Sequence, residues 1–178
     1  MFVYRAYYEK REQDAMQENA KRAPSVTLQA IGHGRKIKID EIGAPTVLIC
    51  VGRETSSQAR PVVEAVREKY PTVADAVIAN VADVRGFPRV LRKVAEQLMK
   101  SSYKDAVEGL DPGKTPEEYV LILPDWDGDV LSPLGVDDVS KQIAVAVIDS
   151  HGSVTGVYQG DDPGLHVVEL LEKTKIAV

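Results

Sequence analysis

The stretch "APTVLICVGRETSSQARPVVEAV" (44–66) decides the fold. Its first part, "PTVLICV" (45–51), is apolar at nearly every position, which predicts a strand that is buried on both faces of a sheet. The polar elbow at 53–60 contains no cysteine, histidine or glycine-rich loop. After the elbow, Val62 and Val66 recur at helical spacing and indicate an amphipathic helix. The stretch therefore predicts a buried strand, a polar turn and a helix, and binding or catalytic groups often lie at such a turn.

Segments of the same kind alternate along the rest of the chain. Strands are expected at 25–30, 35–40, 74–81, 119–124, 143–149 and 153–160, and helices at 5–22, 88–107 and 163–175. A short helix is expected between the strands at 119–124 and 143–149. Because apolar strands that alternate with helices form parallel sheets, and the last two strands form a hairpin, the sheet should be mixed. The sequence thus predicts an α/β domain at 25–178, with helices on both faces of a central mixed sheet, a β-hairpin at its start, and an N-terminal helical arm at 1–24.

Composition and charge describe an ordinary soluble domain. The chain has 178 residues, of which 44% are hydrophobic and 28% charged, with a formal net charge of −5. The acidic balance predicts no nucleic-acid partner, because phosphate binding needs a surplus of Lys and Arg on some face. No apolar run approaches the roughly 20 residues of a membrane span, and the N-terminus lacks the apolar core of a signal peptide. We therefore expect a cytoplasmic protein without a membrane partner, unless a leader is missing from the sequence.

Residues that commonly hold redox centres or metals are scarce. Cys50 is the single cysteine, which excludes an intramolecular disulfide and a Cys-x-x-Cys redox centre. Its place in the apolar strand favours a small core side chain over a reactive thiol. The acidic stretch "DWDGD" (125–129) lacks the later glutamate that a calcium loop needs, so a solvated turn is expected there. We expect no metal and no cofactor.

Three passages carry a resemblance to a known family. They are "GRKIKIDEIGAPTVLICV" (34–51), "PDWDGDVLSPLGV" (124–136) and "IAVAVIDSHGSVTGVYQG" (143–160). In their order and spacing they resemble the thioredoxin-like superfamily, in particular its peroxiredoxin and membrane-anchored thiol-reductase branch. The resemblance covers most of 25–174 and implies a thioredoxin-like fold.

The positions that carry the chemistry of this family differ here. On the resemblance, its two cysteine positions fall on Ser56 and Ala59, and neither side chain forms the thiolate that the family uses at a helix N-terminus. A peroxidatic cysteine would stand three positions after Thr55, where this chain has Gln58. The family's substrate-side proline, usually cis, would fall at 143–144, where this chain has isoleucine and alanine. We therefore expect no thiol oxidoreductase or peroxidase activity.

The elbow keeps polar groups that suit two other roles. The hydroxyl of Thr55 or Ser56 is expected to cap the following helix, because it can accept hydrogen bonds from the N–H groups of the first turn. Arg53 and Arg60 flank the same helix start, and helix N-termini attract anions. The candidate ligand-binding residues are therefore Arg53, Thr55, Ser56 and Arg60, although capping alone is favoured.

The predicted function follows from these residues and from the resemblance. We expect a redox-inactive thioredoxin-fold protein that acts as a recognition, scaffold or chaperone-like module. Its partner would be another protein or a second copy of the chain. One alternative is a non-thiol enzyme or a small-anion-binding protein that uses the helix start at 53–60. A second alternative is a one-cysteine redox protein that uses Cys50.

Overall fold

The computed structural model describes residues 21–176. Most of the predicted N-terminal helical arm lies outside the described residues, and only 21–24 can be compared. These residues are extended rather than helical: Arg22 forms an antiparallel bridge with Ser153. The backbone N–H of Ala23 donates to the carbonyl of Gly152 at 2.8 Å. The prediction that the arm helix continues to residue 22 is therefore wrong, because this segment pairs with the sheet.

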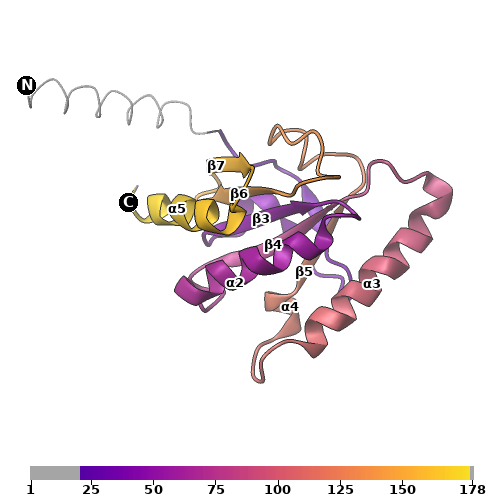
Figure 1. The fold of residues 1–178 in the computed structure, drawn as a ribbon, viewed down its shortest axis with the longest axis horizontal. Coiled ribbons are helices and arrows are strands. Elements are labelled where there is room, and N and C mark those ends of the chain that lie inside the picture. Colours follow the sequence, from indigo (N-terminus) through magenta and orange to yellow (C-terminus); the bar gives the residue numbers. More distant parts are fainter. Residues whose placement is uncertain (1–20, 177–178) are drawn as a thin grey trace, which may run out of the picture.

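The core is a five-stranded mixed sheet with the strand order β5-β4-β3-β6-β7 (Figure 1). Its strands are β3 (Thr46–Val51), β4 (Val77–Asp83), β5 (Leu121–Asp125), β6 (Ala144–Ile148) and β7 (Val154–Gln159). Strand β3 pairs parallel with β4 and antiparallel with β6. Strand β4 pairs parallel with β5, and β6 pairs antiparallel with β7. The α/β fold with a central mixed sheet is confirmed.

Both faces of the sheet are covered, as the apolar pattern of β3 predicts; all six residues of that strand are buried. Helices α2 (Ala59–Lys69) and α5 (Pro163–Ile176) pack on one face through apolar side chains such as Val66 and Leu171. The other face is covered by the antiparallel pair β1 (Thr27–Gln29) and β2 (Lys36–Lys38), the 3-10 turn η1 (Ile39–Glu41) and the turns at 126–139. The predicted hairpin at the start of the domain is thus confirmed, and this hairpin and the turns, rather than the predicted helices, pack on the second face.

The connection between β5 and β6 differs from the prediction. No helix forms at 126–139, where glycines with positive φ, Gly128 and Gly135, interrupt the chain. The carboxylate of Asp125 accepts the backbone N–H groups of Val130 and Leu131 at 3.0 and 2.9 Å, which holds this segment as turns. A short helix, α4 (Pro116–Tyr119), lies instead before β5, because a proline in the first turn suits a helix start.

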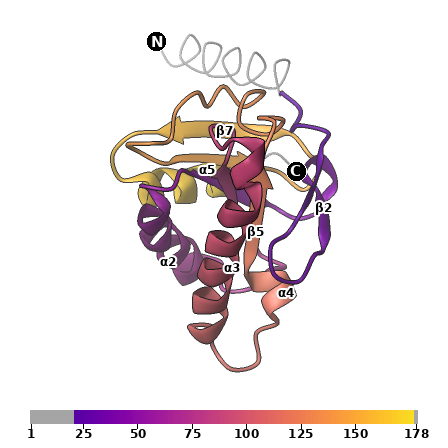
Figure 2. The ribbon, with the colours of Figure 1, turned by 90° about the vertical axis from the view of Figure 1, so that its right-hand side faces the viewer.

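Helix α3 (Arg92–Glu108) lies at the β5 side of the sheet and is preceded by the 3-10 turn η3 (Arg89–Leu91). Figure 2 shows it in front of β5 and apart from α2. Its buried contacts are few: Ala95 and Met99 form a small cluster with Ile31, Val84 and Ile122. This separate position of α3 leaves space between the helix and the sheet.

Candidate functional site

The elbow between β3 and α2 is tied to the loop before β6 by the side chain of Thr55. This side chain is buried, and its Oγ1 donates to the carbonyl of Val139 at 2.7 Å and accepts the N–H of Gly52 at 2.9 Å. The loop approaches so closely that a Cβ at Gly52 would lie 3.0 Å from the Val139 oxygen. Thr55 makes no side-chain cap to the helical turn that follows it. The expected capping role of Thr55 is therefore wrong, and the hydroxyl is a tether.

Ser56 and Ala59 occupy the two positions at which the resemblance places cysteines. Ser56 begins the 3-10 turn η2 (Ser56–Gln58), and its exposed hydroxyl donates to the carbonyl of Arg53 at 3.4 Å. It caps no helix N–H and contacts no histidine among the described residues. Ala59 begins α2 and is buried. Ser56 therefore has neither a capping bond nor the neighbouring base that a serine nucleophile requires.

Gln58, one position before Ala59, pairs with the backbone at the start of β6. Its Nε2 donates to the carbonyl of Lys141 at 3.2 Å, and its Oε1 accepts the N–H of Ile143 at 3.3 Å. The family's cis-proline would fall at 143 or 144, and no peptide bond in the described part of the chain is cis. This pairing could not be predicted from local patterns, because Gln58 and Ile143 are 85 positions apart.

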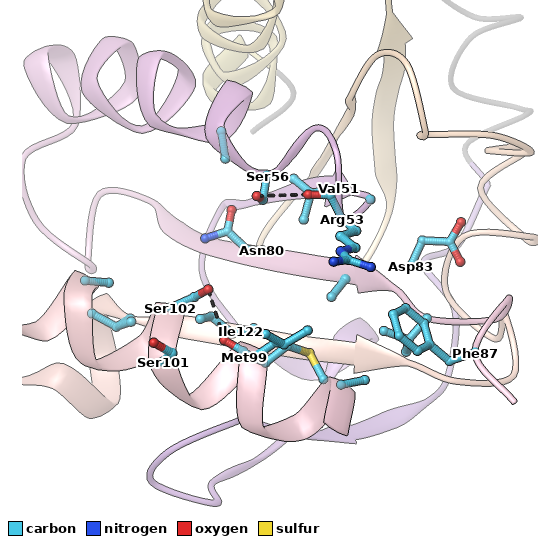
Figure 3. A pocket seen from close by; sticks show the side chains of 18 residues that line it. Val51, Arg53, Ser56, Asn80, Asp83, Phe87, Met99, Ser101, Ser102 and Ile122 are labelled. Atoms are coloured by element: carbon cyan, nitrogen blue, oxygen red, sulfur yellow. Dashed lines mark hydrogen bonds between the residues drawn. The ribbon is translucent and has the colours of Figure 1, made fainter. Parts of the chain in front are cut away.

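A cleft of about 440 Å³ lies beside the elbow, between β4, β5 and α3 (Figure 3). Its walls are mostly apolar. They include Val51, Arg53, Ser56 and Ala59 from the elbow region, Asn80, Ala82, Asp83 and Ile122 from the sheet, and Leu98, Met99, Ser102 and Ala106 from α3. Ligand pockets in proteins have volumes of roughly 300–1,000 Å³ and similar apolar walls. The cleft is therefore large enough for a small molecule or for a few side chains of another protein.

Asn80 is a polar residue of the sheet that faces this cleft. It lies on β4 between Ile49 of β3 and Ile122 of β5. Its Oδ1 is buried and has no hydrogen-bond partner among the described residues. Figure 3 shows the side chain between Ser56 of the elbow and Ser102 of α3. An unpaired buried acceptor costs about 1–3 kcal/mol, which marks Asn80 as a group that a ligand could satisfy.

The four predicted ligand-binding residues do not form one cluster. Arg53 and Ser56 line the cleft, and Arg53 forms no ion pair with any residue that the structure describes. Thr55 is turned inward as the tether described above. Arg60 lies outside the cleft, with 85% of its side chain exposed, and pairs with Glu64 at 2.9 Å. The cleft thus brings together half of the predicted set.

Asp83, which lines the cleft, forms an ion pair with Arg85. Arg85 donates to both carboxylate oxygens of Asp83 at 2.9 Å and also to the carbonyl of Asp137 at 3.0 Å. These hydrogen bonds from Arg85 lower the pKa of Asp83, against the opposing effect of burial. The pair joins the end of β4, which lines the cleft, to the loop before β6.

Cys50 lies in the core and does not reach the cleft. It is fully buried in β3, opposite Val81 of β4 and Ala144 of β6. Burial, with smaller contributions from the charges of Asp125 and Asp83, raises the pKa of its thiol to about 12. At neutral pH the side chain therefore stays a protonated thiol, which is a small apolar group.

Residues 21–176 contain neither a cluster of metal-binding side chains nor a membrane-spanning helix. No group of three or more His, Cys, Asp and Glu side chains in this part of the chain has the arrangement of a metal site. In the stretch "DWDGD", Asp125 is buried and bonds to backbone N–H groups, as described for the turns after β5. None of the helices in the same part combines the length and the apolar run that crossing a bilayer requires.

Comparison with solved structures places the chain among thioredoxin-like folds. A putative electron transfer protein from Aquifex aeolicus VF5 aligns over 87% of this chain and 97% of its own, with a TM-score of 0.60 and 12% identity. A thiol:disulfide interchange protein of the thioredoxin family from Chlorobium tepidum TLS aligns over 88% and 97%, with a TM-score of 0.57 and 12% identity. The dsbF protein of MTB aligns over 85% and 96%, with a TM-score of 0.54 and 22% identity. No protein-family model and no curated protein matches the chain.

These likenesses bear on the fold and not on the activity. Identities of 12–22% over nearly the whole length of both chains accompany a shared arrangement of strands and helices. One fold hosts many unrelated functions, so the thiol:disulfide interchange named for the Chlorobium tepidum protein is not transferred with it. The mixed sheet, its helices and these solved structures together show that the chain has a thioredoxin-like α/β fold.

Proposed function

We propose that the protein is a recognition module that uses the thioredoxin-like fold without thiol chemistry and binds its target in the cleft beside the elbow. The observation that carries the proposal is the position of the cleft. It is open, mostly apolar and about 440 Å³ in volume, and both Ser56 and Ala59 line it. In this proposal the target binds at the place where the resemblance would put a pair of cysteines.

The side chains near the cleft support binding better than redox catalysis. Ser56 and Ala59 have no thiol, and the thiol of Cys50 is buried with a pKa of about 12. A disulfide exchange step needs a thiolate that can reach its substrate. The resemblance of the three sequence passages to the peroxiredoxin and thiol-reductase branch is, in this proposal, a relationship of ancestry rather than of activity.

Site-specific photo-crosslinking tests where the target binds. The photoreactive residue p-benzoylphenylalanine is placed at Ser102, which lines the cleft, and, as a matched control, at Arg60, which is exposed outside it. We expect ultraviolet irradiation in an extract of the source cells to give covalent adducts at position 102 and none at position 60. Equal labelling at both positions, or no adduct at either, would contradict the proposal. So would thiol-dependent turnover of insulin by the purified protein.

A second candidate is the binding of a small anion at the elbow, with or without a non-thiol reaction. One observation favours it: Arg53 lines the cleft and forms no ion pair with a described residue. An arginine at the rim of an apolar cleft suits a carboxylate or a phosphate, because its guanidinium donates in a planar fork. In this candidate, binding of the anion depends on Arg53 and not on Arg60.

A further inference from the structure

The cleft holds a positive charge that nothing in residues 21–176 neutralises. Its charged lining residues are Arg53 and Asp83. Asp83 accepts two hydrogen bonds from Arg85, each at 2.9 Å, so its charge is balanced. Arg53 forms no ion pair with any residue in this range, and Figure 3 shows its guanidinium over the cleft between Asn80 and Phe87. The charge that remains in the cleft is therefore positive and suits an anionic group.

The walls of the cleft near this guanidinium are apolar. They are built in part by the cluster that holds α3 on the sheet, and the apolar lining residues of this part are Val84, Phe87, Ala95, Met99 and Ile122. A bare phosphate or sulfate ion would pair with Arg53 but would leave these walls facing water. A ligand that uses both features carries an anionic group beside an apolar group. A carboxylate next to a large apolar side chain has this chemistry.

Asn80 adds the need for a hydrogen-bond donor. Its Oδ1 has no partner among the described residues, and its side chain lies between Ser56 and Ser102 in the cleft (Figure 3). A peptide N–H is a donor of the kind that this oxygen lacks. A carboxamide also offers its own N–H groups to a carbonyl, so Asn80 is suited to a whole peptide group. The ligand therefore contains an amide next to its apolar group.

An apolar row on α3 continues this surface beyond the cleft. Leu91, Val94 and Leu98 are 44%, 54% and 48% exposed, and they follow one another at intervals of three and four residues. This spacing places them on one side of the helix. Leu98 also lines the cleft, so the row joins the cleft. Contiguous exposed apolar residues mark contact surfaces, and this row extends further than a small molecule in the cleft would cover.

We propose that the cleft binds the C-terminus of a partner protein whose last residue is large and apolar. The terminal carboxylate pairs with Arg53, and the last side chain enters the apolar part of the cleft against Met99 and Ile122. The last peptide N–H donates to Asn80, and the residues before it lie along the apolar row of α3. Capture of a C-terminal carboxylate is a recurring mode of peptide recognition. This inference rests on the proposed function, because it names the kind of target that the cleft recognises.

Other occupants use fewer of these groups. A free apolar acid, such as a fatty acid, has the carboxylate and the apolar chain, but it has no N–H for Asn80 and leaves the row on α3 exposed. An internal segment of a polypeptide has the peptide groups, but its backbone has no negative charge for Arg53. A chain terminus brings the carboxylate, the apolar side chain and the peptide group together in one residue.

Fluorescence anisotropy with pools of labelled hexapeptides tests the inference. In the first pool the last residue is leucine or phenylalanine with a free carboxylate, and the five residues before it are varied. The second pool has the same sequences with a C-terminal amide, which removes the charge. The third keeps the carboxylate but ends in glycine, which removes the side chain. We expect the full-length protein to bind the first pool at least about tenfold more tightly than either control, because each control lacks one main contact.

Substitutions in the cleft give distinct patterns with these pools. Arg53→Ala should bind the amidated pool as tightly as the wild type does, and the free-carboxylate pool no more tightly than the amidated one. A misfolded protein would bind neither pool. Arg60→Ala removes an arginine that lies outside the cleft, and as the matched control it should keep the full preference. Leu98→Asp should weaken binding of both pools at least about tenfold, because it places a charge in the apolar row.

Four outcomes would overturn the inference. They are no binding of the first pool, equal binding of the free-carboxylate and amidated pools, an unchanged preference in Arg53→Ala, or displacement of the first pool by decanoate at a lower concentration than by unlabelled peptides of that pool. The last outcome would make a free apolar acid the ligand.

The crosslinking experiment distinguishes these failures from failure of the proposed function. If position 102 crosslinks while position 60 does not, the cleft is a recognition site and the C-terminal peptide is the wrong occupant. If crosslinking fails as well, both proposals fail.

Discussion

The carboxamide of Gln58 accepts the backbone N–H of Ile143 and donates to the carbonyl of Lys141, so an elbow side chain completes the backbone hydrogen bonding at the start of β6. The family pattern has a proline at 143 or 144, and proline has no N–H. The isoleucine introduces a donor that needs a partner, and Gln58 supplies the acceptor. Gln58 and Ile143 both differ from the family pattern, and the hydrogen bond between them couples the two differences.

This coupling predicts a measurable interaction between the two positions. Gln58→Ala should lower the free energy of unfolding by about 0.5–1.5 kcal/mol, because two backbone groups lose their partner. In the Ile143→Pro background the same change should cost about half as much or less, since one of the two bonds no longer exists. Urea unfolding of the two single variants and the double variant measures the difference. Equal costs in both backgrounds would show that the pair is not coupled.

The tether formed by Thr55 predicts a larger loss of stability. Thr55→Val keeps the shape of the side chain but removes the hydroxyl that serves Val139 and Gly52 in a buried place. The free energy of unfolding should fall by about 1–3 kcal/mol. Ser56→Ala is the control, because its hydroxyl is exposed and its removal should cost less than about 0.5 kcal/mol. The reverse order of the two losses would restore a capping role for Ser56.

Local patterns were sufficient to predict most of the elements. The continuous apolar run of β3 predicted a central strand, and this strand is fully buried. The prediction for β4 began at residue 74, whereas the strand begins at Val77. Thr72 and Asp75 explain the shift, because the carboxylate of Asp75 accepts both the backbone N–H and the hydroxyl of Thr72 and holds a turn there. Such a side-chain turn competes with strand formation. Its signal in the sequence is weaker than the apolar pattern around it.

The cleft could not be predicted in the same way, because its walls come from separate parts of the chain. Its size depends on how far α3 stands from β4, and that distance follows from tertiary packing at Ala95 and Met99. One local signal was available. Asn80 is a polar residue within the apolar strand "ADAVIANV", and such a residue needs either a partner or a ligand.

The buried thiol of Cys50 predicts a pH dependence. Its folded pKa of about 12 lies above its ordinary value of 9.0, so the folded state holds the proton at pH values at which the unfolded state releases it. The resulting contribution to stability is full below about pH 9 and is lost as the pH rises toward 12. Unfolding of the wild type and of Cys50→Ala should therefore show a steeper alkaline loss of stability in the wild type. Identical slopes would contradict the assigned burial effect.

The same burial predicts slow thiol modification. Ellman's reagent at pH 8 should react with Cys50 only after unfolding in urea, because the folded protein has neither a thiolate nor an exposed sulfur at this position. Rapid reaction of Cys50 in the native protein with Ellman's reagent would instead support the one-cysteine redox alternative.

The anion alternative is tested by the two arginines of the elbow. If the cleft binds phosphate, sulfate or a carboxylate, the ligand should raise the melting temperature of the wild type and of Arg60→Ala, but not of Arg53→Ala. The reason is that Arg53 lines the cleft, whereas Arg60 lies outside it and pairs with Glu64. Neither change should alter the unliganded melting temperature much, since exposed ion pairs are worth about 0–1 kcal/mol. Equal responses in all three proteins would exclude an anion site at Arg53.

Asn80 predicts opposite effects on stability and on binding. Asn80→Leu replaces a carboxamide whose Oδ1 is buried and unpaired by an apolar side chain of similar shape, so the free energy of unfolding should stay constant or rise by up to about 2 kcal/mol. Binding should weaken, because the target loses its polar partner at the floor of the cleft, and the yield of adducts with the photoreactive residue at position 102 should fall. Ser57→Ala, an exposed change on the elbow, should alter neither quantity. Residues of a binding site are often retained although they lower stability. For Asn80→Leu we therefore expect equal or higher stability together with weaker binding. A loss of stability greater than about 1 kcal/mol in Asn80→Leu would instead mean that the carboxamide has a structural partner, and Asn80 would then be part of the core rather than of the site.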